Sequence, residues 1–349
     1  MPDYEPSANL LQMAETLVRK QNQIFARLNA ISTAAKSSDA GVIDTFRERL
    51  YYRDFPVDAE QMPDFQERFL ALVKGLDEKS IQTVVLALNR LKKIRGTEER
   101  YLALYSEEEN KEYRENTERL SQETIRLADD CWFYNGCMLP DPDFEASVFS
   151  EKCGLKHLDH PERFAHRDII DAGAYIGDSA LVFAPLTTGK VWAFEPTAEN
   201  YAKLLKTIEL NNLQNVIPCK MALGKEKGSI EMAKSMIASV NTQIPNSVVP
   251  YNGTETVEST TLDAFAEENA LDVGLIKVDV EGAEQLLLSG ALRTIQEKRP
   301  ALLFSIYHNA DDFFRIKPIL EELNLGYHFK IRHPAIGTVL TETMLIAEV

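Results

Sequence analysis

Cysteine is scarce in this sequence and is not spaced for metal binding. The four cysteines are Cys131, Cys137, Cys153 and Cys219. No two of them form a Cys-x-x-Cys pair, and no histidines accompany them at the spacing of a zinc finger. We therefore exclude a zinc finger and expect four reduced thiols in the protein core.

Long apolar runs are also missing. No window approaches the roughly 20 consecutive apolar residues that a membrane-spanning helix needs. The first ten residues, MPDYEPSANL, lack the basic stretch and apolar core of a secretory leader. We therefore expect no membrane span and a cytoplasmic location.

Positive charge is in short supply. The chain has 38 basic residues against 54 acidic ones, which gives a formal net charge of -16 at pH 7. This excess of negative charge works against attraction to phosphate backbones and anionic membranes. We therefore expect no nucleic-acid partner.

Apolar residues are present in sufficient number for more than one core. The chain has 349 residues, of which 44% are hydrophobic, and domains usually contain about 100 to 200 residues. We predict a helical N-terminal domain (1–130), a connecting segment (131–164) and an α/β domain (165–349). The connecting segment contains FYNGCMLPDPDF, whose Gly, Pro and Asp residues break helices.

Helical periodicity dominates the first 130 residues. Leu10, Leu17, Ile24 and Ile31 recur at every seventh position, and a second apolar set recurs at spacings of three and four. The second set is Ile81, Val84, Val85, Leu88, Leu91 and Ile94. The heptad either joins two copies of the chain as a homodimer or packs within its own helical bundle, and the sequence leaves both open.

After residue 165, short apolar segments alternate with amphipathic helices, which is typical of a parallel α/β sheet. The expected strands are DIIDAG (168–173), KVWAFEP (190–196), NVIPC (215–219), LIKVDV (275–280) and ALLFSIYH (301–308). The expected helices cover residues 197–212, 281–296 and 311–324. No helix separates YHFKIRH (327–333) from TMLIAEV (343–349), so we expect these two segments to pair as an antiparallel hairpin.

The loop DAGAYIG (171–177) follows the first expected strand, where α/β sheets bind ligands. Gly173 and Gly177 have no side chain to keep a bound molecule away from the backbone. A dinucleotide fingerprint reads GxGxxG, whereas this loop reads DxGxxxG. Asp171, which we expect to face the ligand, and Asp178 would repel a pyrophosphate and attract a cation. The loop therefore predicts a positively charged ligand.

S-adenosylmethionine meets this requirement, because it carries a sulfonium and an ammonium group and no phosphate. Glu195, after the second expected strand, is placed to accept hydrogen bonds from both ribose hydroxyls, although a nicotinamide enzyme would use an acid in the same place. Met221 and Ala222 offer apolar surface to a flat adenine. The predicted cofactor-binding residues are Asp171, Gly173, Ala174, Tyr175, Gly177, Asp178, Ser179, Glu195, Pro196, Met221, Ala222 and Asp279.

A second acidic signal follows the strand LIKVDV. Asp279 and Glu281 lie at the tip of an apolar strand, where carboxylates are costly to bury unless something pairs with them. Glu281 and Glu284 are also explained as acids that cap the next helix. His308, at the end of ALLFSIYH, would lie on the same edge of the sheet. We take Asp279, His308 and Glu281 as candidate catalytic residues.

These side chains suit methyl transfer to an alcohol. The enzyme must align the acceptor oxygen behind the methyl group, and a base that removes the proton gains about 100-fold to 10,000-fold. Asp279 and His308 are rival candidates for this base. Together with Glu281 they also suit a divalent ion, namely Mg, Mn or Zn. Glu342, in TETMLIA, is expected near the substrate.

Five segments, in this order, resemble the FkbM family of S-adenosylmethionine-dependent methyltransferases: DAGAYIGDS, AFEP, KVDVEGAE, IYH and TETMLIA. The resemblance extends over the α/β domain and leaves the N-terminal part unexplained. It implies a class I, Rossmann-like fold with a seven-stranded sheet whose last strand is antiparallel. It also implies O-methylation of hydroxyls, often on sugars or glycosylated natural products. The sequence departs from the family at two positions. Family members more often have Asn where Tyr175 stands, and they more often have an aromatic residue where Ile346 stands.

We therefore predict a methyltransferase of the EC 2.1.1 class that methylates a hydroxyl of a sugar or glycan-type small molecule. Two other functions stay open. One is a nicotinamide-dependent oxidoreductase, which would need a diphosphate to approach Asp171. The other is a catalytically inactive scaffold that binds partners through its helical N-terminal part.

Overall fold

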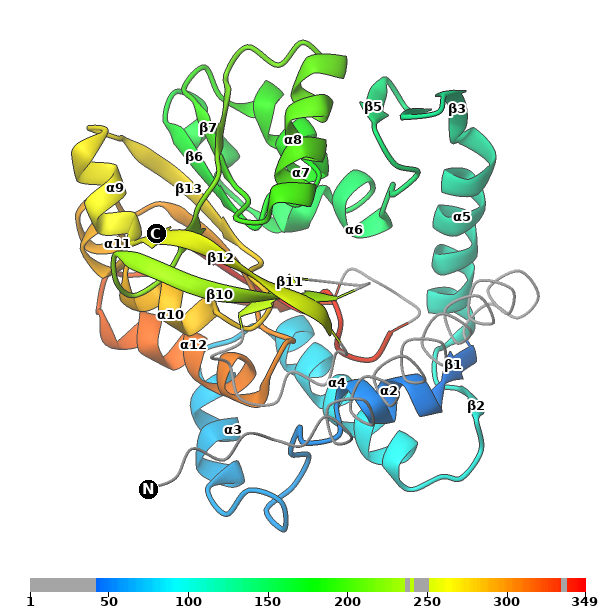
Figure 1. Ribbon diagram of the computed structural model, residues 1–349. Coiled ribbons are helices and arrows are strands. Elements are labelled where there is room, and N and C mark those ends of the chain that lie inside the picture. Colours follow the sequence, from blue (N-terminus) through cyan, green and yellow to red (C-terminus); the bar gives the residue numbers. More distant parts are fainter. Residues whose placement is uncertain (1–41, 236–238, 242–250, 334–337) are drawn as a thin grey trace, which may run out of the picture.

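The computed structural model describes residues 42–235, 239–241, 251–333 and 338–349. The heptad that begins at Leu10 lies outside the described residues, so its role stays a prediction. The described chain is built around a seven-stranded sheet with helices on both faces (Figure 1). None of the helices in these ranges is both long and apolar enough to cross a membrane.

The seven-stranded sheet confirms the predicted, mostly parallel α/β arrangement. Its strands, in spatial order, are β15 (His328–Arg332), β16 (Met344–Glu348), β14 (Ala301–Ser305), β13 (Val273–Val278), β6 (Asp168–Ala172), β7 (Val191–Phe194) and β8 (Val216–Cys219). The strands from β14 to β8 are parallel, whereas β16 runs antiparallel to both β14 and β15. The central strand β13 is buried at every position, which explains its almost wholly apolar sequence, VGLIKV.

The two faces of the sheet have separate cores, because neighbouring residues on a strand point to opposite sides. Ile170 packs into one core and Ile169 into the other. The first core is covered by α9 (Leu262–Glu268), α10 (Glu284–Ser289), α11 (Leu292–Lys298) and α12 (Ala310–Glu322). The second is covered by α7 (Asp178–Phe183), α8 (Ala198–Leu210), α6 (Ala146–Phe149) and the 3-10 helices η1 (Lys152–His157), η2 (Pro161–Phe164) and η3 (Ala184–Leu186).

The prediction of one helix over residues 281–296 is wrong. The structure has two helices there, α10 and α11, which are separated at Gly290. A Cβ on Gly290 would lie 2.1 Å from the backbone oxygen of Gly224, so the two chain segments come together only with glycine at this position. Both helices face the same core, and their apolar pattern therefore continues across the break.

Residues 42–130 are not purely helical, which corrects the predicted all-helical N-terminal domain. The helices are α2 (Thr45–Tyr51), α3 (Phe65–Val73), α4 (Glu78–Arg95) and α5 (Glu107–Glu123). Strand β1 (Val42–Asp44) pairs antiparallel with β2 (Tyr101–Ala103), and β3 (Ile125–Ala128) pairs with β4 (Cys131–Tyr134), which pairs with β5 (Cys137–Leu139). Strands of three or four residues are too short for an alternating pattern to identify them.

Helix α4 packs directly on the edge of the main sheet. Ser80, in its first turn, accepts a hydrogen bond of 2.8 Å from the backbone N–H of Ile331 on β15. Arg332 on the same strand pairs with Asp77, the N-cap of α4, at 2.8 Å. Apolar residues of α4 belong to the same core as the first face of the sheet. This docking covers an edge strand and brings the N-terminal part to the sheet.

The segment between β8 and α9 forms a four-stranded sheet that the sequence analysis does not predict. Its order is β11 (Ser239–Asn241), β10 (Gly228–Ser235), β12 (Tyr251–Thr260) and β9 (Ala222–Leu223). The long β10–β12 ribbon is the yellow-green pair of arrows in Figure 1. Ile230 and Met232 of β10 line the cavity described next, so this ribbon forms part of its wall.

Candidate active site

A cavity of about 1110 Å³ lies at the carboxyl ends of the parallel strands. Residues at the ends of β6, β7, β13 and β14 line it, as expected for the ligand site of an open α/β sheet. The N-terminal part also contributes a wall, through Tyr52, Phe55 and Met62. The cavity is therefore built by both parts of the chain.

Most of the predicted site residues line this cavity. They are Gly173, Tyr175, Asp178, Ser179, Glu195, Pro196, Met221, Ala222, Asp279, Glu281 and His308, together with Glu342. Asp171, Ala174 and Gly177 do not line it. The fold thus brings the predicted residues to one place, and the role of each stays a prediction.

Asp171 does not face a ligand, which corrects the expectation from the sequence. Its side chain is fully buried, accepts a hydrogen bond of 2.6 Å from Ser179 Oγ, and lies 3.3 Å from Nζ of Lys277 on the neighbouring strand β13. Lys277 also donates to the backbone oxygen of Gly173 at 2.7 Å. Asp171 and Lys277 are therefore a buried ion pair that joins β6 to β13 beneath the loop.

Lys277 is a site residue that the sequence analysis missed. Burial alone would lower the pKa of its ammonium group, but the carboxylates of Asp171 and Asp279 outweigh burial and raise the pKa above its usual value. The signal in the sequence was a lysine inside the apolar segment LIKVDV. A charge at such a position requires a buried partner.

The two loop glycines are required by the packing of the loop. Gly173 has a φ of +80°, and a Cβ on it would lie 1.8 Å from the backbone oxygen of Asp279. Gly177 has a φ of +89°, and its Cβ would lie 2.9 Å from Leu204 Cδ1 on α8. Both positions require a left-handed backbone and a missing side chain.

Acidic groups crowd the cavity beside the loop. Asp178 is buried, and burial together with the nearby Glu145 raises its pKa to about 7. The Tyr175 hydroxyl bonds with the carboxylate of Asp143, and burial followed by this carboxylate raises the pKa of the phenol. This wall therefore favours a positively charged ligand.

Glu195 is fixed at the end of β7. Its Oε1 accepts hydrogen bonds from the backbone N–H of Thr197 at 3.0 Å and from the Thr197 hydroxyl at 2.5 Å. Burial raises the pKa of this carboxyl above its usual value. Because Thr197 is the N-cap of α8, the start of the helix holds Glu195 against the cavity.

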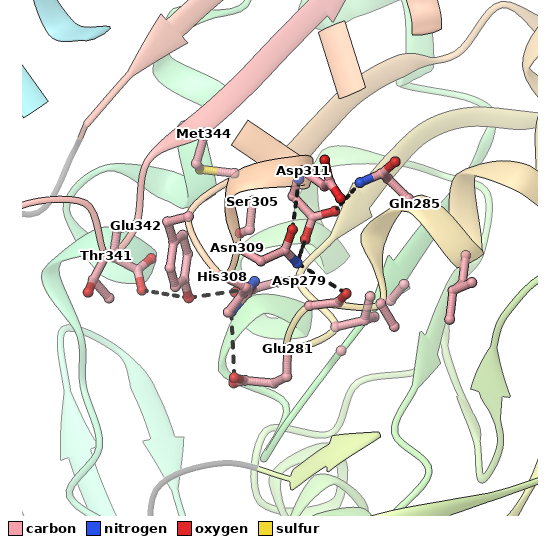
Figure 2. A pocket seen from close by; sticks show the side chains of 18 of the residues that line it. Asp279, Glu281, Gln285, Ser305, His308, Asn309, Asp311, Thr341, Glu342 and Met344 are labelled. Atoms are coloured by element: carbon pink, nitrogen blue, oxygen red, sulfur yellow. Dashed lines mark hydrogen bonds and ion pairs between the residues drawn. The ribbon is translucent and has the colours of Figure 1, made fainter. Parts of the chain in front are cut away.

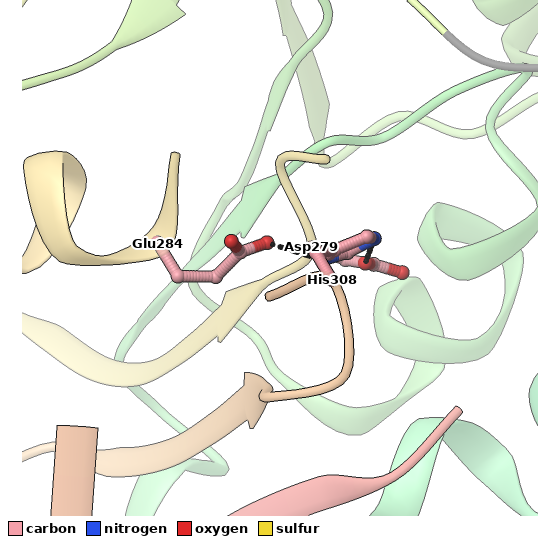
Figure 3. A group of neighbouring side chains, drawn as sticks. All are labelled: Asp279, Glu284 and His308. Carbon is pink, nitrogen blue, oxygen red and sulfur yellow. Dashed lines mark ion pairs between the residues drawn. The ribbon is translucent and has the colours of Figure 1, made fainter. Parts of the chain in front are cut away.

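His308 lies among three carboxylates. Its Nδ1 is 3.0 Å from Oε1 of Glu284, and its Nε2 is 3.6 Å from Oδ1 of Asp279 and 3.5 Å from Oε2 of Glu281. Figure 2 shows Glu281 and Asp279 beside the imidazole, and Figure 3 shows Glu284 on its other side. Sequence reasoning placed Asp279, Glu281 and His308 together but gave Glu284 only a capping role.

Glu284 belongs to a buried chain of carboxyl groups. Its Oε1 accepts a hydrogen bond of 2.9 Å from the backbone N–H of Val280, and its carboxylate bonds with the carboxyl of Asp312. Burial, followed by the charge of Glu284, raises the pKa of Asp312 to about 9. Burial also acts to raise the pKa of Glu284, but His308 outweighs it and lowers this pKa. Asp312 therefore keeps its proton at neutral pH while Glu284 is ionised.

Glu342 reaches the cavity from the loop before β16. The Tyr307 hydroxyl donates to Glu342 Oε1 at 3.4 Å and to Asp279 Oδ1 at 3.5 Å. Burial, with the nearby carboxylates of Glu145 and Asp279, raises the pKa of Glu342 well above its usual value. The raised pKa favours the protonated form of Glu342, which is able to donate a hydrogen bond.

The predicted metal set does not fit this geometry. Among the described residues, ligand atoms of Asp279, Glu284 and His308 lie within 4.8 Å of one another, so Glu284 takes the place predicted for Glu281. Glu284 is fully buried, and the atom that would bind an ion is already held by Val280 N–H and His308 Nδ1.

Because several buried carboxyl groups have raised pKa values, we predict that the protein is more stable at pH 6 than at pH 8.5. The pKa values are raised to about 7 for Asp178 and Glu281 and to about 9 for Asp312. Since unfolded carboxyls titrate near pH 4, the stability that these protons contribute is lost as the pH rises through 7 to 9. We expect the thermal midpoint to fall by about 5 °C over this interval. Asp312→Asn should reduce the decrease, and a midpoint that rises with pH would contradict the interpretation.

Comparison with known proteins relates the sheet-bearing part to a family. Residues 171–329 match the sequence model of the methyltransferase FkbM domain. The match covers less than half of the chain, so it shows a similarity of this part to the family. This confirms the resemblance seen in the sequence and does not favour the oxidoreductase alternative. A comparison with curated protein sequences gave no match.

One solved structure supports the fold. The structure of methyltransferase FkbM from Methylobacillus flagellatus has a TM-score of 0.50 and 21% identity, over 83% of this chain and 60% of that one. The present chain thus spans 60% of the length of that protein. An rRNA methylase from Streptococcus thermophilus has a TM-score of 0.33 and 12% identity, over 59% of this chain and 96% of that one. The likeness to the first structure supports a methyltransferase-like α/β fold.

Proposed function

We propose that this protein is an S-adenosylmethionine-dependent O-methyltransferase that acts on a hydroxyl of a sugar or glycan-type small molecule. One observation carries the proposal: a single cavity at the carboxyl ends of the strands has Glu195 on β7 and the cluster of Asp279, Glu281 and His308 after β13 and β14. The FkbM domain supports the methyl donor, since methyltransferases of this kind use S-adenosylmethionine.

The proposed cofactor-binding site lies along the carboxyl ends of β6 and β7. Glu195 would accept hydrogen bonds from the ribose hydroxyls, and Met221 and Ala222 would contact the adenine. The acidic wall at Asp178 would favour the positive charge of the sulfonium and ammonium groups. A dinucleotide would instead bring a diphosphate to this wall.

The proposed binding site for the methyl acceptor lies between Asp279 and the N-terminal part. Pockets for small molecules usually measure about 300 to 1,000 Å³, so a cavity of about 1110 Å³ offers room for a cofactor and a small acceptor. Tyr52, Phe55 and Met62 supply apolar surface there. The N-terminal part would thus shape the acceptor pocket and shield it from water.

In the proposed reaction, a hydroxyl oxygen of the acceptor attacks the methyl carbon in line with the carbon–sulfur bond. The C–O bond forms as the C–S bond breaks, and the electron pair of the broken bond stays on sulfur. The hydroxyl proton passes to a base in the cavity, for which Asp279, Glu281 and His308 are the candidates. The products are the methyl ether and S-adenosylhomocysteine.

Calorimetry with S-adenosylhomocysteine tests the cofactor site. We expect binding to the wild type, and Glu195→Gln to weaken it about 10- to 100-fold, because a charge-assisted hydrogen bond to the ribose is lost. Gln keeps an oxygen that accepts from Thr197, so the local fold should survive. Glu199→Gln, on the exposed side of α8, is the matched control and should bind normally.

Two outcomes would contradict the proposed function. One is the absence of heat and of a thermal shift with S-adenosylhomocysteine at high concentration. The other is tight binding of NADH while S-adenosylhomocysteine is inert. If the cofactor binds, release of S-adenosylhomocysteine from S-adenosylmethionine in a panel of sugars, nucleotide-sugars and glycans identifies the acceptor.

A further inference from the structure

The environment of the His308 ring indicates which group takes the proton of the acceptor hydroxyl. The side chain is only 10% exposed, and both ring nitrogens face carboxylate oxygens. Glu284 faces Nδ1, while Asp279 and Glu281 face Nε2. An ionised carboxylate offers only lone pairs, so a ring nitrogen without hydrogen would meet repulsion on that side.

We propose that Glu284 holds His308 as a doubly protonated imidazolium, which positions Asp279 and Glu281, and that one of these two carboxylates takes the proton of the acceptor hydroxyl. This inference rests on the proposed function above. It gives Glu284 a role as a positioning residue and removes His308 from the candidates for the base.

Hydrogen-bond chemistry supports this assignment. A neutral imidazole has one N–H group and one lone pair, and it can satisfy an acceptor on only one side. The carboxylates lie at ion-pair distances of 3.0 to 3.6 Å from the two ring nitrogens, and only a ring with hydrogen on both nitrogens attracts the carboxylates on both sides. An imidazolium has no free lone pair, so it cannot receive the proton of an alcohol.

Glu284 is anchored so that it keeps its charge and its direction. It is fully buried, and its Oε1 accepts from the backbone N–H of Val280 in the turn between β13 and α10. The carboxyl of Asp312 on α12 is hydrogen-bonded to it and is itself held by Gln285, which donates to Asp312 Oδ1 at 3.1 Å. Glu284 thereby fixes the His308 ring from the side that faces away from the cavity.

Five acidic groups near His308 come from four parts of the fold, and the cation Lys277 on β13 interacts with two of them, Asp279 and Glu342. Asp279 follows β13, Glu281 and Glu284 lie at the start of α10, Asp312 lies on α12, and Glu342 lies on the loop before β16. Burial acts to lower the pKa of His308, but Glu284, Glu281 and Asp279 outweigh it and raise this pKa well above its usual value. Burial and neighbouring carboxylates raise the pKa of Asp312 and of Glu342.

Charge is conserved within the cavity when a carboxylate is the base. The sulfonium loses its positive charge as the C–S bond breaks, and the carboxylate of Asp279 or Glu281 loses its negative charge as it takes the proton. His308 keeps its two N–H groups throughout and contributes a fixed positive charge beside the carboxylates. Product release and loss of the proton to water restore the site.

Nitrogen NMR of protein labelled with 15N-histidine tests the inference directly. The chain has six histidines, and loss of one signal set in His308→Gln assigns the resonances. We expect both ring nitrogens of His308 to show the imidazolium pattern at pH 7.5. His333 is the internal comparison, because burial lowers its pKa to about 4 and it should be neutral in the same spectrum. A neutral tautomer of His308 at pH 7.5 would overturn the inference.

Two variants separate positioning from structure. Glu284→Gln should lower the pH at which His308 loses a proton, whereas Glu281→Gln should change it less, because Glu281 lies at 3.5 Å and is 40% exposed. An unchanged titration in Glu284→Gln would overturn the role given to Glu284. If this variant does not fold, the wild-type spectrum still decides the protonation state.

Turnover measurements on variants of Asp279 and Glu281 test which group is the base. Asp279→Asn or Glu281→Gln should lower turnover by about 100- to 10,000-fold. Near-normal turnover in both variants would overturn the assignment of the base. The spectrum does not depend on methyl transfer, so failure of S-adenosylhomocysteine binding would remove the proposed function while His308 is still tested.

Discussion

Gly173→Ala is expected to lower the free energy of unfolding by more than about 4 kcal/mol or to prevent folding. An added Cβ would lie 1.8 Å from the backbone oxygen of Asp279, which real structures do not allow. The same backbone segment donates from Asp279 N to Ala172 O at 3.0 Å, so moving it away would separate β6 from β13 at the cavity. Chemical denaturation measures the effect, and S-adenosylhomocysteine binding should be lost with it.

Gly136→Ala is the matched control for this variant. Gly136, in the turn between β4 and β5, has a φ of +84°, close to the +80° of Gly173, and no atom lies within 4 Å of the added Cβ. It should therefore cost only the left-handed conformation, about 1 to 2 kcal/mol. Equal losses in the two variants would mean that the contact with Asp279 has no separate cost, contrary to this prediction.

Lys277→Met is expected to destabilise the protein by about 3 to 5 kcal/mol, because it leaves Asp171 buried and without its cation. Asp171 would keep the hydrogen bond from Ser179 but would lose the ion pair at 3.3 Å. Unfolding in denaturant measures the loss. The double variant Asp171→Asn with Lys277→Met should recover a large part of it, since no buried charge then remains.

Lys227→Met provides the exposed counterpart. Lys227 also lies 3.3 Å from a carboxylate, that of Glu268, but its side chain is 71% exposed. An exposed pair is worth about 0 to 1 kcal/mol, so this variant should be nearly neutral. Similar losses in Lys277→Met and Lys227→Met would show that burial does not decide the strength of the pair between Lys277 and Asp171.

The location of the site could be predicted from the sequence because parallel strands end at a common edge. Glu195, Asp279 and His308 each follow an expected strand, and the fold brings all three to one cavity. The sequence also singled out the glycines of the first loop, but it did not reveal their packing contacts. The packing of β13 and α8 against Gly173 and Gly177 is a long-range contact that the local pattern does not contain.

The partners of the buried charges could not be predicted. Asp171 meets Lys277 only because β6 and β13 are neighbours in the sheet, although they are far apart in the chain. Glu284 meets His308 only because α10 begins beneath the end of β14. The division of residues 281–296 into two helices likewise depends on the backbone of Gly224, outside that segment.

By itself, the sequence determined the α/β class, the resemblance to the FkbM methyltransferase domain and the strand ends that line the cavity, because these depend on local apolar patterns and on short motifs. Tertiary structure alone decided which carboxylates are paired, which have raised pKa values, and which residues of the N-terminal part line the cavity. Those properties depend on burial and on contacts between residues distant in the chain, and electrostatic energies change steeply with both.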